Sequence, residues 1–219
     1  MNYLQLCQRF VEDTGIEGQG PTTVTGQTGI YGKVVRWVRD ADRAIQNKHQ
    51  DWDFLWAEYS FETIAGVTQY VAPSTIGTWG EFWIEIDGEY RQLDIIGFDE
   101  WKRLDRATDE QDAPHCLAID PQRNLRLYPA PDDEYTISTE YWRSPKVLAT
   151  NTDTSLIPTR FERIILCRAK MYFAEHDEAP VLIQTAPQEY MEILREMEAV
   201  YLHGRSPSTK QTHFNVVPE

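Results

Sequence analysis

The chain has few cysteines and no long apolar run. Its three cysteines, Cys7, Cys116 and Cys167, are too few and too widely spaced to form a disulfide framework. A reducing compartment is therefore expected. No apolar run approaches the roughly 18 residues that a membrane-spanning helix needs. Charged and amide side chains occur among residues 1–15 and leave no long apolar stretch there, so no signal peptide is expected.

Basic residues are scarce relative to acidic ones. The chain has 21 Lys and Arg against 35 Asp and Glu, which gives a formal net charge of -14. A free surface of this charge repels the phosphate backbone, so sequence-specific binding of nucleic acid is not expected. A protein that DNA passes without adhering to it is still compatible with this charge.

Motifs of catalysis and metal binding are also missing. His115 and Cys116 are neighbours on a predicted strand and would point to opposite faces. His176 is followed by Glu178 as in zinc deaminases, but the P-C-x-x-C of that motif is absent. The G-x-S-x-G of a hydrolase is absent as well. The sequence therefore predicts no catalytic residue, no metal and no cofactor.

Apolar residues recur at helical spacing in four segments, with Gly15 and Gly204 as the predicted ends of the first and the last. Cys7 and Cys167 fall on apolar helix faces and are expected in the core. The four segments are residues 2–14, residues 30–47, a helix that begins at a capping box of Thr159 and Glu162, and a helix that begins at Pro180 and kinks at Pro187, or begins afresh near Pro187.

Between these helical regions, residues alternate between apolar and polar as in β-strands. Asp87 and Gly88 predict a type I′ turn. Asp99 is expected to cap a short helix that carries Trp101. Serial hairpins without helical crossovers predict an antiparallel sandwich or a partly open barrel. The expected strands are residues 59–64 paired with 67–72, residues 81–86 paired with 89–95, residues 115–119 paired with 125–128, and residues 135–142.

Together these segments predict an α+β fold. It consists of an antiparallel helical bundle of two N-terminal and two C-terminal helices, an inserted antiparallel β-sandwich or barrel-like domain, and an extended C-terminal arm. The predicted domains are residues 1–50 with 157–204 for the bundle, 51–156 for the β domain and 205–219 for the arm. The arm is either a frayed terminus or a segment that orders on a partner, with Phe214 as its anchor.

Several segments of the chain resemble a known family, the head–tail adaptor (connector) proteins of tailed bacteriophages. The resemblance covers nearly the whole chain to about residue 201, and its motifs are structural and not catalytic. The segments that carry it are YLQLCQ at residues 3–8, GPTTV at 20–24, VVRWV at 34–38, IQ at 45–46, WDFLW at 52–56, LRLYP at 125–129 and AP at 179–180.

The resemblance implies a structural virion protein that is not an enzyme. It implies a homo-oligomeric ring, usually of twelve copies, that docks beneath the portal in the neck. The ring joins the capsid to the tail and surrounds the channel through which the DNA leaves. The implied partners are further copies of the chain, the portal protein and the next neck or tail protein. Genomic DNA passes without sequence-specific binding, no membrane takes part, and assembly occurs in the host cytoplasm.

Three sets of residues are candidates for these contacts. Similar adaptors grip the portal with their C-terminal segment, which points to Arg205, Lys210, Phe214, Val216 and Val217. The aromatic residues expected in subunit contacts or in the core are Trp37, Trp52, Trp56, Trp83 and Trp142. The acids proposed to line the channel are Asp105, Asp109, Glu110 and Asp112.

Two other functions fit parts of the sequence. Another neck or tail protein, such as a terminator or a hub, would share the aromatic content without needing a partner-ordered arm. A carbohydrate-binding or hydrolase module would act as a monomer and stack sugars on Trp83 and Trp142.

Overall fold

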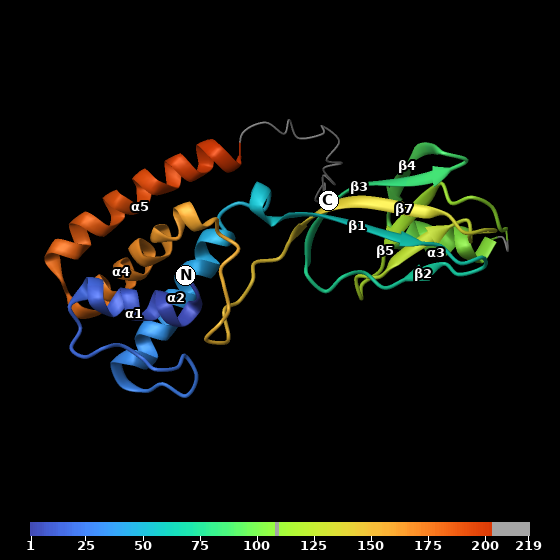
Figure 1. Cartoon of the computed structure of the whole chain (residues 1–219). Helices are drawn as coiled ribbons and strands as arrows, with labels where there is room; N and C mark the ends of the chain where they lie inside the picture. The colour runs from blue at the N-terminus through green and yellow to red at the C-terminus, as the bar shows by residue number, and fades with distance from the viewer. Residues whose placement is uncertain (108–109, 203–219) are drawn as a thin grey trace, which may run out of the picture. The chain divides into compact units, whose positions relative to one another are not determined.

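The chain combines helices with one curled β-sheet (Figure 1), which confirms the predicted α+β class. The structure is a computed structural model that describes residues 1–107 and 110–202. Within these residues it contains five α-helices and seven strands. The described chain divides into a helical unit, made of Met1–Gln46, Trp52–Phe54 and residues 147–202, and a β unit, made of Asn47–Asp51 and the described residues from Leu55 to Lys146.

The helical unit holds four α-helices and two short 3-10 turns. Asn2 and Gln5 form a capping box at the start of the first helix, and Gly15, with a φ of 69°, ends it as predicted. The last helix begins at Pro180 and runs through Pro187 without interruption. The elements are α1 (Tyr3–Thr14), α2 (Gly29–Gln46), η1 (Asp53–Leu55), η2 (Thr159–Phe161), α4 (Arg163–Asp177) and α5 (Pro180–Tyr201).

Helix α4 is the centre of this unit, because α1, α2 and α5 all pack against it. It is therefore buried over most of its circumference and has no single apolar stripe. At one end, Phe173 meets Phe10 of α1 edge-on, with ring centroids 6.1 Å apart, and Trp37 of α2 at 5.8 Å. The predicted antiparallel bundle remains a prediction about how these helices are arranged.

The capping box predicted at Thr159 and Glu162 is wrong. Residues after Pro158 form a 3-10 turn, in which the Phe161 N–H bonds to the Pro158 carbonyl at 2.8 Å. The Glu162 carboxylate instead accepts the Met1 ammonium at 2.6 and 2.7 Å. Thr159 lies inside the 3-10 turn and not at the N-cap position before α4, and no side chain caps the start of α4.

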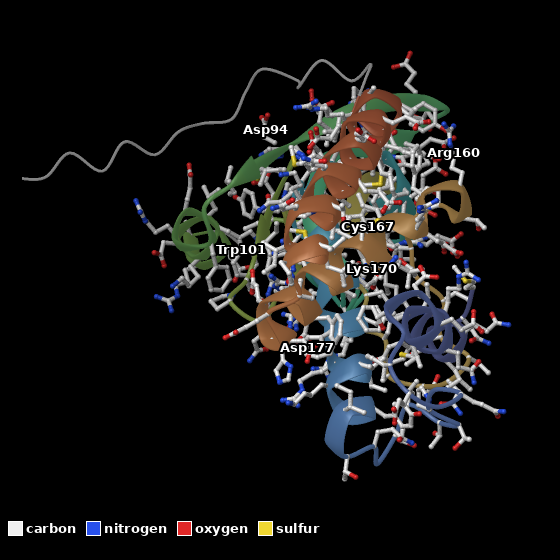
Figure 2. All side chains as sticks on the ribbon, turned by 90° about the vertical axis from the view of Figure 1, so that its left-hand side faces the viewer. Asp94, Trp101, Arg160, Cys167, Lys170 and Asp177 are labelled. Atoms are coloured by element: carbon white, nitrogen blue, oxygen red, sulfur yellow. The ribbon has the colours of Figure 1, made fainter. Side chains whose placement is uncertain are left out.

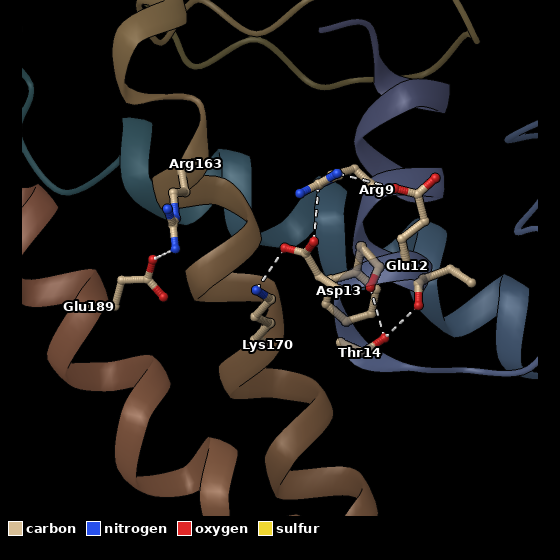
Figure 3. Close-up of polar contacts among 9 residues, drawn as sticks. Arg9, Glu12, Asp13, Thr14, Arg163, Lys170 and Glu189 are labelled. Carbon is tan, nitrogen blue, oxygen red and sulfur yellow. Dashed lines mark hydrogen bonds and ion pairs between the residues drawn. The ribbon is translucent and has the colours of Figure 1, made fainter.

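Polar contacts also join the helices (Figure 3). Lys170 of α4 donates to Asp13 of α1 at 2.8 Å, and Arg9 of α1 pairs with the same carboxylate at 3.0 Å. Arg163 of α4 pairs with Glu189 of α5. Figure 2 shows Cys167 and Lys170 on α4, with Cys167 buried as predicted.

The β unit is one curled, half-barrel sheet, in place of the two packed sheets of a sandwich. Its strand order is β1-β7-β3-β4-β5-β6-β2. The strands are β1 (Trp56–Glu62), β2 (Gln69–Tyr70), β3 (Ile76–Ile86), β4 (Glu89–Ile96), β5 (Cys116–Ile119), β6 (Leu125–Tyr128) and β7 (Thr136–Arg143). Their inward faces form an apolar core of Phe82, Ile84, Leu93, Leu117, Leu125, Leu127 and Ile137.

Two predicted pairings were right and one was wrong. Asp87 and Gly88 have φ of 54° and 81°, and they join β3 to β4 as a type I′ turn requires. Strands β5 and β6 also pair as predicted. The turn at Gly66 exists, but β1 pairs with β7 and β2 pairs with β6, so the two flanking strands form no hairpin.

The expectation of no helical crossover was also wrong. Strands β4 and β5 are parallel, and helix α3 (Phe98–Ala107) connects them. Trp101, labelled in Figure 2, is a residue of α3. It is buried, and its indole N–H donates to the Leu127 carbonyl at 2.9 Å. The helix already begins at Phe98, so Asp99 lies in its first turn and is not the cap.

Candidate interaction surfaces

The buried thiols are poor nucleophiles. Burial raises the pKa of Cys7 and Cys167 to about 12 and that of Cys116 to about 11, so all three stay protonated at neutral pH. Among the residues that the structure describes, no group of three or more His, Cys, Asp or Glu is placed to hold a metal ion. The remaining candidate sites are therefore surfaces for contact with other molecules.

Two of the five candidate tryptophans lie in the helical unit. Trp52 is completely buried, and its indole N–H donates to the Ile45 carbonyl of α2 at 3.2 Å. Its ring stacks on Phe54 with centroids 5.2 Å apart. Trp37 is half-buried and contacts the ring of His176 at 5.4 Å. Trp52 is thus unavailable to a partner, whereas Trp37 keeps one accessible side.

The other three lie on strands of the β unit. Trp56 of β1 and Trp142 of β7 are half-buried and stand directly opposite each other in the strand register. Trp83 of β3 is 37% exposed, and it lies on the outward face of the sheet because Phe82 and Ile84 point into the core. Trp83 is the most accessible of the five, and a role in subunit contact stays a prediction.

The structure describes three of the four candidate channel acids. Asp105 is exposed on α3, and Glu110 and Asp112 are exposed in the segment between α3 and β5. Asp109 lies outside the described residues. The five portal-binding candidates, from Arg205 to Val217, also lie outside them. The channel and portal hypotheses therefore stay predictions.

The sequence reasoning missed a cavity at the start of α2. This cavity of about 290 Å³ is rimmed by two arginines, Arg36 and Arg39, one helical turn apart. Gly29 and Gly32 lie in the first turn of the helix; Gly29 has open space beside it, whereas Gly32 packs against the Gln27 carbonyl. Arg39 pairs with its neighbour Asp40 at 3.1 Å. The arginine spacing was the available signal, since residues three apart on a helix share a face. Its full lining is Gln27, Thr28, Gly29, Gly32, Val35, Arg36 and Arg39.

An uncharged stretch, residues 63–80, was also missed. It contains no Asp, Glu, Lys or Arg, although charged residues make up 26% of the chain. Three of its aliphatic side chains are exposed: Val71 by 75%, Ile64 by 63% and Val67 by 37%. Ile64 and Val67 lie between the two edge strands β1 and β2, and Val71 follows β2, where its carbonyl accepts the Tyr59 hydroxyl of β1 at 3.2 Å. An exposed aliphatic cluster in an acidic protein favours contact with another protein.

The described residues thus offer exposed surfaces, among them the cavity at α2 and the aliphatic side chains of residues 63–80. Residues 1–211 match the family described as SU10 adaptor protein. The chain belongs to this family of phage structural adaptors, which confirms the resemblance inferred from the sequence. A search of curated proteins finds no match.

Membership in this family makes the chain a virion component that interacts with other head or tail proteins of a phage. The family is not a class of enzymes. Within the described residues, no helix is both long enough and apolar enough to cross a bilayer.

Proposed function

We propose that the chain is the head–tail adaptor of a tailed phage. Copies of it form a closed ring, for which the family resemblance implies twelve subunits, beneath the portal in the neck. The ring links the capsid to the tail and surrounds the channel through which the genome leaves. The observation that carries this proposal is the match to an adaptor family over residues 1–211.

Charge supports the channel role. The net charge of -14 disfavours adhesion of DNA to the protein, so a ring that exposes acids to its lumen lets DNA slide. Asp105, Asp109, Glu110 and Asp112 are the proposed lining. A ring also buries surface between subunits, which gives the exposed aliphatic side chains of residues 63–80 a place out of water.

The parts of the chain divide the work in this proposal. The domain of residues 1–50 and 157–204 packs around the ring. The β domain of residues 51–156 faces the next neck or tail protein. The arm of residues 205–219 grips the portal, with Phe214, Val216 and Val217 as apolar contacts and Arg205 and Lys210 as charged ones.

A density map of intact virions at the head–tail junction tests the proposal. We expect a ring of this chain against the portal, with residues 205–219 running along the portal surface. If the chain is found elsewhere in the tail, the terminator or hub alternative replaces the adaptor. If the chain is absent from the neck and tail, the next experiment is glycan binding by the purified monomer through Trp83 and Trp142.

A further inference from the structure

We propose that the acidic tip of the β3–β4 hairpin of one copy inserts into the arginine-rimmed cavity at the start of α2 in the next copy. The inference deepens the proposed function and rests on it, since it names the contact that joins neighbouring subunits of the ring. We call the cavity the socket and residues 85–92 the hairpin tip.

The socket is concave and basic. Its volume of about 290 Å³ corresponds to about ten water molecules, which leaves room for one or two side chains of a partner. Arg36 is exposed at its rim and forms no ion pair with any described residue. Gly29 has open space where a side chain would stand, so the start of the helix is accessible there. A carboxylate that enters here meets the guanidinium group of Arg36, which is suited to paired hydrogen bonds, while Arg39 already pairs with Asp40.

The surroundings make this cationic site unusual in the chain. Residues 33–48 contain five of the 21 basic residues and two acids. One of these acids, Asp42, is completely buried and hydrogen-bonded to Gln46 at 2.7 Å, so it does not neutralise the surface. The exposed side of α2 is therefore basic in a protein whose net charge is -14.

The hairpin tip has the complementary form. Strand β3 pairs with β7 as far as Glu85, and β4 meets β5 only from Asp94, so residues 86–89 at the end of the tip extend beyond both neighbouring strands. Residues 87–92 are all exposed, although β4 belongs to the sheet. The tip carries Glu85, Asp87 and Glu89 against one basic residue, Arg91. A hydrogen bond between Glu85 and Tyr90 raises the pKa of Tyr90 and leaves Asp87 and Glu89 as the outermost acids.

The charges of the socket and of the tip favour a second copy of the chain as the molecule that binds in the socket. Two chains of charge -14 repel each other unless acids of one meet bases of the other, and the socket and the tip supply both partners. Each copy has one socket and one tip, so the contact joins different patches of neighbouring subunits. Such a head-to-tail contact forms a ring when its rotation closes.

The test is the self-association of the full chain, measured by sedimentation equilibrium at low salt. We expect Arg36→Glu and Glu89→Arg each to weaken association of the wild-type chain at least tenfold. The matched controls are Arg43→Glu, an exposed position on the same helix outside the socket, and Glu62→Arg, an exposed position on β1. These controls should leave association within about twofold of wild type. All four positions are exposed, and circular dichroism melts check that each variant is folded.

A mixture of the socket variant Arg36→Glu with the tip variant Glu89→Arg gives the decisive result. Arg36→Glu and Glu89→Arg present swapped charges to each other, so mixing them should restore association above that of either variant alone. Association should also weaken as salt is added, because exposed ion pairs are screened.

Three results would overturn the inference. They are a wild-type chain that stays monomeric at the highest soluble concentration, equal effects of Arg36→Glu and Arg43→Glu, and a mixture that associates no better than its components. If any of these results is obtained and the chain is still found as a ring in virions, only the inference about this contact is rejected. Absence of the chain from the neck removes the proposed function itself.

Discussion

The Lys170 ammonium donates to the Asp13 carboxylate at 2.8 Å, which joins α4 to α1 across 157 positions of sequence. Both side chains are largely shielded, with exposures of 13% for Lys170 and 21% for Asp13. The helical unit is thus assembled from the two ends of the chain, while the intervening residues fold largely into the β unit. Contacts of this kind, and not the local sequence, keep α1 and α4 together.

We expect Asp13→Asn and Lys170→Met each to lower the free energy of unfolding by about 1 kcal/mol, because a shielded ion pair is worth more than an exposed one. A double-mutant cycle measured by urea unfolding should give a coupling of about 0.5–1 kcal/mol. The matched control is Arg160 with Glu196, whose side chains are 55% and 63% exposed. Equal coupling in both cycles would contradict the structural role of Asp13.

Trp52 offers a test of the core. Trp52→Ala should lower the free energy of unfolding by about 3–5 kcal/mol, since the side chain is completely buried and donates to Ile45. Trp83→Ala, at a position 37% exposed, should cost less than about 1 kcal/mol. Thermal melts of the two variants measure the difference. A near-wild-type melting temperature for Trp52→Ala would show that Trp52 is not part of the folded core.

Asp120 predicts how stability depends on pH. Burial alone would raise the pKa of Asp120, but hydrogen bonds from the Asn124 backbone and side chain, from Arg126 and from the Gln122 backbone outweigh it and hold that pKa below its ordinary value. A lowered folded-state pKa stabilises the protein above the unfolded value of about 3.9. This stability is lost as the pH falls through the folded-state pKa.

Asp120→Asn should therefore cost about 1–3 kcal/mol at pH 7, and the difference from wild type should shrink as the pH falls toward 3. Urea unfolding of both proteins at a series of pH values measures this. Asp133→Asn is the control, because Asp133 is exposed on another loop of the same unit. A difference that stays constant over the whole pH series would show that ionisation of Asp120 is not what stabilises the loop.

Removal of residues 205–219 separates folding from attachment. We expect the truncated chain to melt within about 2 °C of the full chain, because the buried residues of the described structure all precede Leu202. We also expect it to lose binding to the portal, which a pull-down with purified portal measures. Full binding by the truncated chain would show that the arm is not the portal-binding segment.

Local signals in the sequence were sufficient for several elements. The spacing of apolar residues located α1, α2 and α5, and Gly15 marked the end of α1 because glycine adopts a positive φ without strain. The Asp87-Gly88 pair marked the β3–β4 turn for the same reason. Each of these features depends on interactions within a few residues, which a single sequence displays.

Strand partners were predictable only where a tight turn joined them. Residues 67–72 follow β1 after a turn, yet only Gln69–Tyr70 forms a strand, and it pairs with β6 while β1 pairs with β7. The inward faces of all these strands are apolar, so the alternation is the same for either partner. The pairing was decided by how the whole sheet curls around its core, including Phe82 and Ile137.

The candidate surfaces also divide into features that the sequence determines and features that only the tertiary structure decides. Sequence alone determined the acidic character, the lack of catalytic motifs and the membership in an adaptor family, because these depend on which residues are present. Only the tertiary structure decided that Trp52 is buried while Trp83 is accessible, and that Arg36 and Arg39 rim a cavity. The burial of Trp52 arises from packing between segments far apart in the chain, and the cavity depends on how residues 27–29 fold back on α2, so the apolar and charged pattern alone encodes neither.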